Sequence, residues 1–348
     1  MLLLLGLMTA ATSQAQATPQ RITGNATICS NSPVPAGWVI TSSYSTGSCT
    51  GTSYLYTISD ASTLTNATVC SYSPVPAGWV ITSGYNSGIC ANTTFVYTIT
   101  KLTTQANVTV CSYSPVPKGW VITSGYNLGI CTGTTFVYTL ANTANLTNVT
   151  VCSYSPVPTG WVITSAYNLG ICTATTFVYT LANTANLTNV TVCSYSPVPT
   201  GWVITSAYNL GICTATTFVY TLANTANLTN VTVCSYSPVP TGWVITSGYN
   251  LGICSATTFV YTLANTANLT NVTVCSYSPV PTGWVITSAY STGGCTSAGY
   301  MYTLAKLTTQ TNAAVCSFSP IPTGWVISGS YNTGSCADSG FGYYIRKV

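Results

Sequence analysis

The chain has 348 residues, of which only 2% are charged, and six Lys and Arg against two Asp give a net charge of +4. A typical soluble domain has about 25% charged residues. The basic residues are scattered and form no dense patch, so the sequence predicts no nucleic-acid partner. Glu and His are absent, and acid–base catalysis relies on such groups, so the composition predicts neither an enzyme nor a cofactor.

The N-terminus has the pattern of a secretory signal peptide. An apolar run, Leu2–Met8, is followed by small residues and by an Ala-Gln-Ala that ends at Ala17. Seven apolar residues cannot cross a bilayer core of about 30 Å, and no later segment approaches spanning length. We therefore expect a signal peptide over residues 1–17, a polar lead-in over 18–24, and a secreted or cell-surface protein without a transmembrane segment after cleavage.

Residues 25–348 are predicted to form eight tandem repeats of one fixed length. The stretch Cys152–Val192 recurs residue for residue as Cys193–Val233. One Trp marks each repeat, at the same interval along the whole chain: Trp38, Trp79, Trp120, Trp161, Trp202, Trp243, Trp284 and Trp325. A fixed period of about 41 residues is typical of solenoids, propellers and arrays.

Three segments of the fourth repeat are rich in the β-branched and aromatic residues that favour strands: Asn148–Tyr154, Gly160–Tyr167 and Thr175–Leu181. The two prolines of Ser155–Gly160 interrupt any ladder, because proline has no N–H donor and a fixed φ. Asn168–Gly170 also favours a turn. No segment has a useful helical period, so the sequence predicts an all-β fold.

We expect these repeats to form an elongated tandem array, either of separate beads or of stacked units that share a core. A β-solenoid is one alternative, because Asn148–Cys152 and Asn168–Cys172 share a pattern that suggests two related half-turns. An eight-bladed propeller is another, since a repeat of this length fits one blade. A blade normally has four strands, however, and the sequence predicts three.

Sixteen cysteines recur at two alternating spacings that differ by a single position, which predicts disulfides in an exported chain. Pairing across the longer spacing would leave Cys29 and Cys336 without partners. Pairing across the shorter spacing gives Cys29–Cys49, Cys70–Cys90, Cys111–Cys131, Cys152–Cys172, Cys193–Cys213, Cys234–Cys254, Cys275–Cys295 and Cys316–Cys336. Clustered metal-ligating residues are absent, so no metal site is predicted.

Four aromatic residues of the fourth repeat are candidates for a ligand platform: Tyr154, Tyr167, Tyr179 and Trp161. Each has aromatic counterparts in other repeats, and a Trp or Tyr face on a rigid scaffold can stack on a sugar ring. The alternative is that Trp161 lies in the core and the tyrosines form cross-strand pairs.

The sequence favours a secreted structural repeat protein, a component of an extracellular fibre, a stalk or a cell-surface adhesin whose repeats set length and valency. Low charge favours self-association, and an extracellular surface or a glycan is the other expected partner. The first alternative is a multivalent, lectin-like protein that binds carbohydrates or surfaces. Thr-rich strands also suggest ice binding as a third and less favoured function, although no Thr-x-Thr pattern is sustained.

Overall fold

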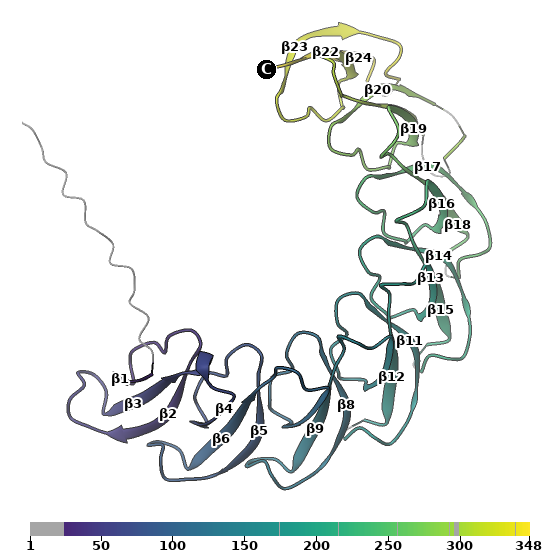
Figure 1. Ribbon diagram of the computed structural model, residues 1–348. Coiled ribbons are helices and arrows are strands. Elements are labelled where there is room, and N and C mark those ends of the chain that lie inside the picture. Colours follow the sequence, from purple (N-terminus) through teal and green to yellow (C-terminus); the bar gives the residue numbers. More distant parts are fainter. Residues whose placement is uncertain are drawn as a thin grey trace, which may run out of the picture. The chain divides into compact units, whose positions relative to one another are not determined.

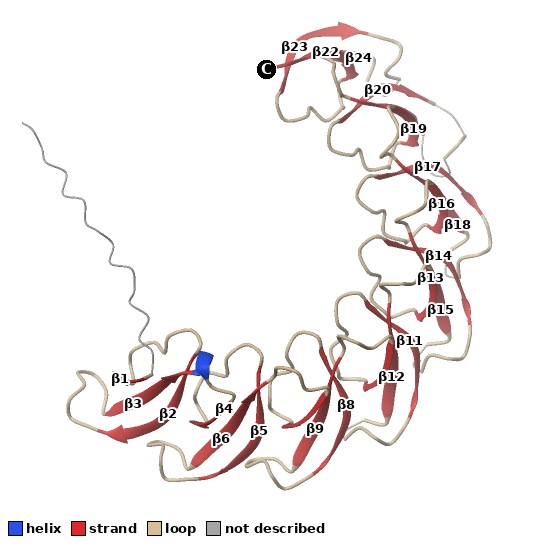
Figure 2. Cartoon of the chain, viewed as in Figure 1, coloured by secondary structure: helices blue, strands red, loops and turns tan. Residues whose placement is uncertain are grey.

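The computed structural model describes residues 24–348 except 174, 215, 256, 292, 296–298 and 338. The predicted signal peptide and the lead-in up to residue 23 lie outside the described residues. The described chain is all-β and forms eight three-stranded antiparallel sheets, one for each repeat (Figures 1 and 2). The prediction of an all-β tandem array of disulfide-containing repeats is therefore confirmed.

The strands of repeats one to four are β1 Asn25–Cys29, β2 Trp38–Ser45, β3 Tyr54–Asp60, β4 Asn66–Cys70, β5 Trp79–Asn86, β6 Phe95–Lys101, β7 Asn107–Cys111, β8 Trp120–Asn127, β9 Phe136–Asn142, β10 Asn148–Cys152, β11 Trp161–Asn168 and β12 Phe177–Asn183. Those of repeats five to eight are β13 Asn189–Cys193, β14 Trp202–Asn209, β15 Phe218–Asn224, β16 Asn230–Cys234, β17 Trp243–Asn250, β18 Phe259–Asn265, β19 Asn271–Cys275, β20 Trp284–Tyr290, β21 Met301–Lys306, β22 Asn312–Cys316, β23 Trp325–Asn332 and β24 Phe341–Lys347. A short 3₁₀ helix, η1, covers Ala61–Thr63.

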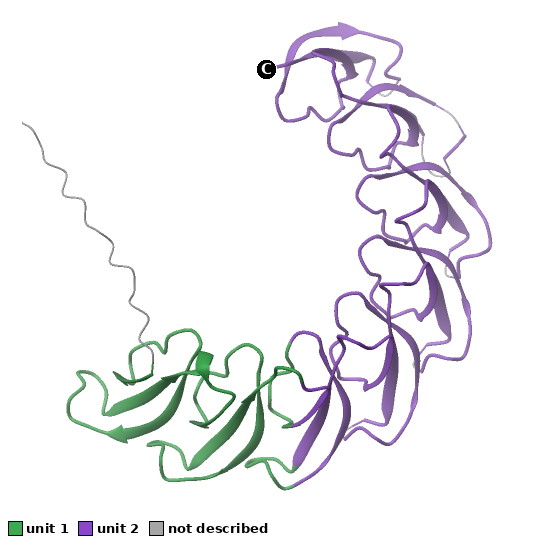
Figure 3. Cartoon of the chain, in the orientation of Figure 1, with its two compact units in different colours: residues 1–104, 110–117, 129–135 green, residues 105–109, 118–128, 136–348 purple. Residues whose placement is uncertain are grey.

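The chain divides into two compact units (Figure 3). Unit one comprises residues 1–104, 110–117 and 129–135, and unit two comprises residues 105–109, 118–128 and 136–348. The same local structure recurs in both units, and the fourth repeat, in unit two, is representative of it.

The last strand of each repeat lies in the middle of its sheet. In the fourth repeat the order is β10-β12-β11, and both pairings are antiparallel. The three strands predicted from the sequence are present, with ends within two residues of the predicted ones. A bulge at Thr164 shifts the register of β11, because Ile163 faces Leu181 whereas Ser165 faces Thr180.

Strand β11 begins with three consecutive buried residues, Trp161, Val162 and Ile163. An ordinary half-buried strand would alternate buried and exposed side chains. Here Trp161 and Ile163 belong to one core cluster, whereas Val162 belongs to the next cluster, with Trp202 and Leu222 of the fifth repeat. Both faces of β11 are therefore covered, which explains the unbroken apolar run.

Neighbouring repeats share a core. One cluster in unit two contains Val121 from the third repeat, Trp161 and Leu181 from the fourth, and Cys213 and Val219 from the fifth. A unit as short as one repeat buries little apolar surface by itself, and stacking adds the apolar faces of its neighbours. The structure thus favours stacked units over the independent beads that the sequence left open.

The proline-containing segment forms a tight turn that anchors the link to the next repeat. Gly160 has φ +80°, a left-handed conformation that glycine adopts without strain, and the Trp161 N–H donates to the Pro158 carbonyl over 3.0 Å. Thr184, which follows β12, donates its N–H and its hydroxyl to the Gly160 carbonyl, at 2.9 and 2.8 Å. The connection between repeats is therefore fixed by hydrogen bonds.

One disulfide closes each repeat, and the structure joins the cysteines in the eight pairs that their spacing predicts. In the fourth repeat, Cys152 ends β10 and Cys172 lies in the loop between β11 and β12. The bond ties that loop to the edge of the sheet. Closing a loop of about 20 residues lowers the entropy of the unfolded chain by roughly 3 kcal/mol in the chain-entropy model.

Two details of the sequence-based alternatives differ from the local structure. Asn148–Cys152 is a strand, but of Asn168–Cys172 only Asn168 belongs to one and the rest is a turn, so the repeat does not consist of two equivalent halves. Each repeat supplies three strands, one fewer than a propeller blade normally has.

Candidate contact surface

Each repeat is joined to the next through the edge of its second strand. The Ala166 N–H on β11 donates to the Ile212 carbonyl, and the Thr214 N–H donates to the Ala166 carbonyl, both over 3.0 Å. These bonds form a short parallel bridge between Ala166 and Cys213. The cysteine loop of the fifth repeat thereby covers part of an edge strand that would otherwise expose unpaired backbone groups.

The bridging residue is small in every repeat because the next repeat approaches closely. A Cβ added to Gly125 would lie 2.7 Å from the Tyr154 hydroxyl oxygen and 3.1 Å from the Thr173 nitrogen. The bridging positions are Ser43, Gly84, Gly125, Ala166, Ala207, Gly248 and Ala289, and the equivalent residue of the last repeat is Ser330. A large side chain at this position would separate the two repeats.

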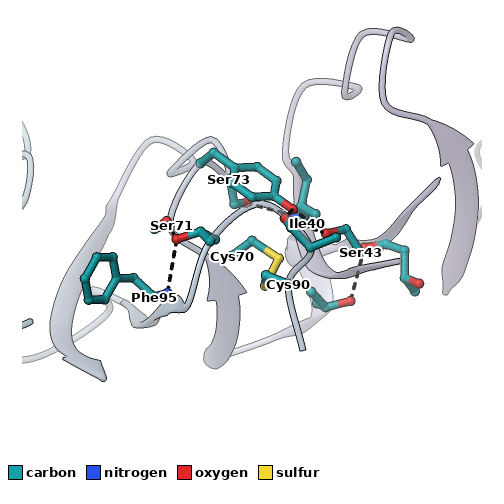
Figure 4. The surroundings of a disulfide bond; sticks show 12 residues. Ile40, Ser43, Cys70, Ser71, Ser73, Cys90 and Phe95 are labelled. Carbon is teal, nitrogen blue, oxygen red and sulfur yellow. Dashed lines mark hydrogen bonds between the residues drawn. A yellow bond between two sulfur atoms is a disulfide. The ribbon is translucent and has the colours of Figure 1, made fainter. Parts of the chain in front are cut away.

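A buried serine makes the second polar contact between repeats. In unit one the Ile40 N–H donates to the Ser73 hydroxyl oxygen over 2.8 Å, close to the Cys70–Cys90 disulfide (Figure 4). In unit two the Ile163 N–H donates to Ser196 over the same distance. A buried N–H needs a partner, and the serine of the following repeat supplies it.

Tyrosines pair across the boundaries between repeats. Tyr154 packs on Tyr138 of the preceding repeat with ring centroids 5.3 Å apart, and Tyr179 packs on Tyr195 of the following repeat at 5.7 Å. Burial, followed by the proximity of Tyr138, raises the pKa of Tyr154 to about 12. The Tyr154 hydroxyl therefore stays protonated well above neutral pH.

The structure does not gather the four predicted platform residues into one surface. Trp161 is only 5% exposed, which fits the core interpretation and leaves no ring face for a ligand. Tyr179 is half-buried against Tyr195. Tyr167 is exposed and pairs with Val178 of β12. Tyr179 follows Val178, and successive side chains of a strand point to opposite faces, so Tyr167 and Tyr179 lie on opposite faces of the sheet.

Another set of apolar residues is exposed in and around the loop that follows the second strand of the interior repeats. Leu169 and Ile171, in the loop after β11, are 40% and 38% exposed. Tyr167 and Phe177, at the ends of β11 and β12 that flank this loop, are also exposed, on opposite faces of the sheet. Hydrogen bonds from Leu169 to the Thr176 carbonyl and from Ile171 to the Leu169 carbonyl hold the loop in shape. We call these four residues the apolar tip.

The apolar tip recurs in unit two as Tyr208, Leu210, Ile212 and Phe218, and as Tyr249, Leu251, Ile253 and Phe259. Repeats one, seven and eight have polar or small residues at the two aliphatic positions: Thr46 and Ser48, Thr292 and Gly294, and Thr333 and Ser335. The sequence favours a turn at Asn168–Gly170 and does not by itself predict a contact surface there. The sequence signal for this surface is the pair of large aliphatic residues, Leu169 and Ile171, on either side of Gly170, because a turn does not need apolar side chains to pack against a strand.

Charged residues occupy the last position of the third strand in the outer repeats. Asp60, Lys101, Lys306 and Lys347 are equivalent to Asn183, which faces Trp161 across the sheet. The four interior repeats have Asn there. In unit one, Asp60 and Lys101 line one groove between consecutive proline turns, together with Trp38 and Trp79.

Other grooves offer amide groups. Two repeating grooves of about 530 and 520 Å³ lie between consecutive linkers in unit two, and Asn186, Asn189 and Asn227 are among the residues that line them. No cluster of three or more potential metal ligands occurs among the described residues. Over the same part of the chain, no helix is long and apolar enough to cross a membrane.

No protein family, curated protein or solved structure matches this chain. The chemistry of its own surfaces is therefore the basis for any function assigned to it.

Proposed function

We propose that this chain is an extracellular structural repeat protein, a component of a fibre or a cell-surface layer that adheres through the apolar tips of its interior repeats. The observation that carries the proposal is the recurrence of one preformed, exposed apolar loop in consecutive repeats. Eight disulfides suit an oxidising extracellular environment.

The local structure supports a scaffold that holds its contact groups in place. Each apolar tip is tied to the sheet by a disulfide, and its Ile171 carbonyl accepts the N–H of Gly125 from the preceding repeat. A preordered loop loses little conformational freedom on binding, which favours adhesion.

Several weak contacts on one scaffold add up. Leu169 and Ile171 are each about two-fifths exposed, so covering them contributes roughly 1 kcal/mol apiece, since full burial of such a side chain is worth about 1.5–3 kcal/mol. One tip does not offset the entropy lost on association. Successive tips bind at a high effective concentration once the first has bound, so their contributions accumulate.

The chemistry of the tip favours an apolar partner surface over a sugar. A sugar site combines an aromatic face with polar groups that bind the hydroxyls. Tyr167 and Phe177 are accompanied by the aliphatic side chains of Leu169 and Ile171, which offer no hydrogen bonds. A lectin-like role is the outcome expected instead if soluble sugars compete for the same surface.

The test converts interior tips into the polar type that repeat one carries. The substitutions are Leu169→Thr, Ile171→Ser, Leu210→Thr, Ile212→Ser, Leu251→Thr and Ile253→Ser. We expect binding to a methyl-terminated monolayer, followed by surface plasmon resonance, to weaken by roughly tenfold or more while circular dichroism is unchanged.

A matched control adds a tip instead, by Thr333→Leu with Ser335→Ile in the last repeat, and should strengthen binding to the same monolayer. Equal binding by all variants would refute the role of the tips. Saturable binding on a glycan array that the tip variant loses would replace the proposal with the lectin-like function.

A further inference from the structure

The second strand of the last repeat exposes residues that every earlier repeat buries. In β23, Val326 is 37% exposed and Ile327 is 51% exposed. Their counterparts in β11, Val162 and Ile163, are 0% and 4% exposed. The residue types are the same, so the last repeat retains the apolar face of an interior repeat, not a polar cap.

In the other repeats this face is covered by the repeat that follows. At the first such boundary, inside unit one, Ile40 donates to Ser73, while Ser43 exchanges backbone hydrogen bonds with Ile89 and Ala91. The equivalent isoleucine–serine bond is present at all seven boundaries. The last repeat keeps a small bridging residue, Ser330, of the same type as Ser43, and it is exposed.

The first repeat carries the complementary face. Ser32, the counterpart of the buried Ser73, is exposed, and Ile28 is half-buried where its counterpart Val69 is fully buried. Asn31 donates to the Thr50 carbonyl over 3.1 Å, just as the Tyr72 hydroxyl donates to the Ala91 carbonyl over 3.2 Å. The segments of the first repeat around Asn31 and Thr50, which would cover a preceding repeat, are thus held together as their counterparts are at an internal boundary.

We propose that the β23 face of one molecule binds the first repeat of a second copy of this chain, and that copies join head to tail. The junction repeats the internal boundary: Ile327 N–H donates to Ser32, Ser330 N–H donates to the Ser48 carbonyl, and Thr50 N–H donates to the Ser330 carbonyl. Because the two faces differ, the association is heterologous and continues from copy to copy.

Charge supports this orientation. Within unit one, the Asp60 of one repeat and the Lys101 of the next line the same groove. A head-to-tail junction places Lys347 of one copy and Asp60 of the next at these two positions, again with opposite signs. Arg346, which faces Val326, and Lys347 give the β23 end two cations, so two β23 ends repel each other.

The assembly depends on the boundary between repeats and not on the apolar tips, so it goes beyond the proposed adhesive function and can fail separately. The six-substitution tip variant should assemble as the wild type does. Loss of assembly in that variant would assign self-association to the tips and overturn the head-to-tail junction.

The decisive experiment uses two blocked variants of the full oxidised chain, Ile327→Lys on the β23 face and Ser32→Lys on the first repeat. Both positions are exposed, so circular dichroism should not change. In sedimentation velocity over a concentration series, the wild type should form progressively larger species, and each variant alone should remain monomeric. An equimolar mixture should form a dimer with one copy of each and nothing larger.

Three results would overturn the proposal. A wild type that stays monomeric at its solubility limit shows that no copy covers the face. Larger species formed by Ile327→Lys alone show that association uses another surface. Dimers formed by Ser32→Lys alone, while Ile327→Lys stays monomeric, would show that β23 ends pair with each other.

Discussion

Replacing Ser73 by Ala tests how strongly one repeat is bound to the next. The substitution removes the acceptor of the Ile40 N–H, which lies 2.8 Å from the Ser73 oxygen. Ser73 is only 8% exposed and Ile40 is buried, so water does not readily replace the hydroxyl. A buried donor left without a partner costs about 1–3 kcal/mol, and we expect the boundary between repeats one and two to weaken by that amount.

Hydrogen exchange followed by mass spectrometry is the suitable assay, because the strand that contains Ile40, Trp38–Ser45, has a sequence found in no other repeat. A loss of about 1–3 kcal/mol corresponds to exchange roughly 5–150 times faster at this amide when exchange proceeds through local opening. Amides in distant repeats should exchange at the wild-type rate, since interactions in stacked repeats are mainly between nearest neighbours.

Ser32→Ala is the matched control, because Ser32 is the same residue at the same position of a repeat but is exposed. At protein concentrations below any self-association, this variant should be as stable as the wild type. Equal protection of Ile40 in wild type and Ser73→Ala would refute the importance of the bond. A uniform loss across all repeats would show that the array unfolds as one unit.

The disulfides and the tyrosines give two further tests. Cys70→Ser combined with Cys90→Ser should lose about 3 kcal/mol and also expose Trp38, whose core cluster includes both cysteines; unchanged Trp38 fluorescence would contradict the shared core. Burial raises the pKa of Tyr154 to about 12, whereas a tyrosine of the unfolded chain has a pKa near 10. Between about pH 10 and 12 the unfolded chain therefore binds fewer protons than the folded one. The free energy of unfolding should fall as the pH rises through this range. Tyrosinate absorbance that titrates entirely near pH 10 in the folded protein would refute this.

Much of the local structure follows from composition and periodicity. Counting cysteines from both ends leaves one pairing without orphans, and the structure has that pairing. The β-branched runs predict three strands to within two residues because pleated backbone suits those side chains. Neither argument depends on what a strand packs against.

Features that depend on the neighbouring repeat could not be predicted in the same way. The run Trp161–Ile163 is compatible with a buried bead or a stacked unit, and only its division between two core clusters distinguishes them. Variation between Gly, Ala and Ser at the position of Ala166 looks neutral in sequence, but the approach of a tyrosine from the next repeat restricts it. The predicted platform does not form one surface for a related reason. Tyr167 and Tyr179 lie on opposite faces of the sheet, and the sequence alone does not show which face each tyrosine occupies.

The absence of charged side chains between Lys118 and Lys306 has a consequence for the conditions that these repeats withstand. Residues 119–305 contain no Asp, Glu, Lys, Arg or His. Acidification therefore protonates no side chain there, and salt screens no ion pair, so neither should loosen these repeats. We therefore expect these repeats to keep their fold in acid and in high salt, conditions that alter proteins held together by ion pairs.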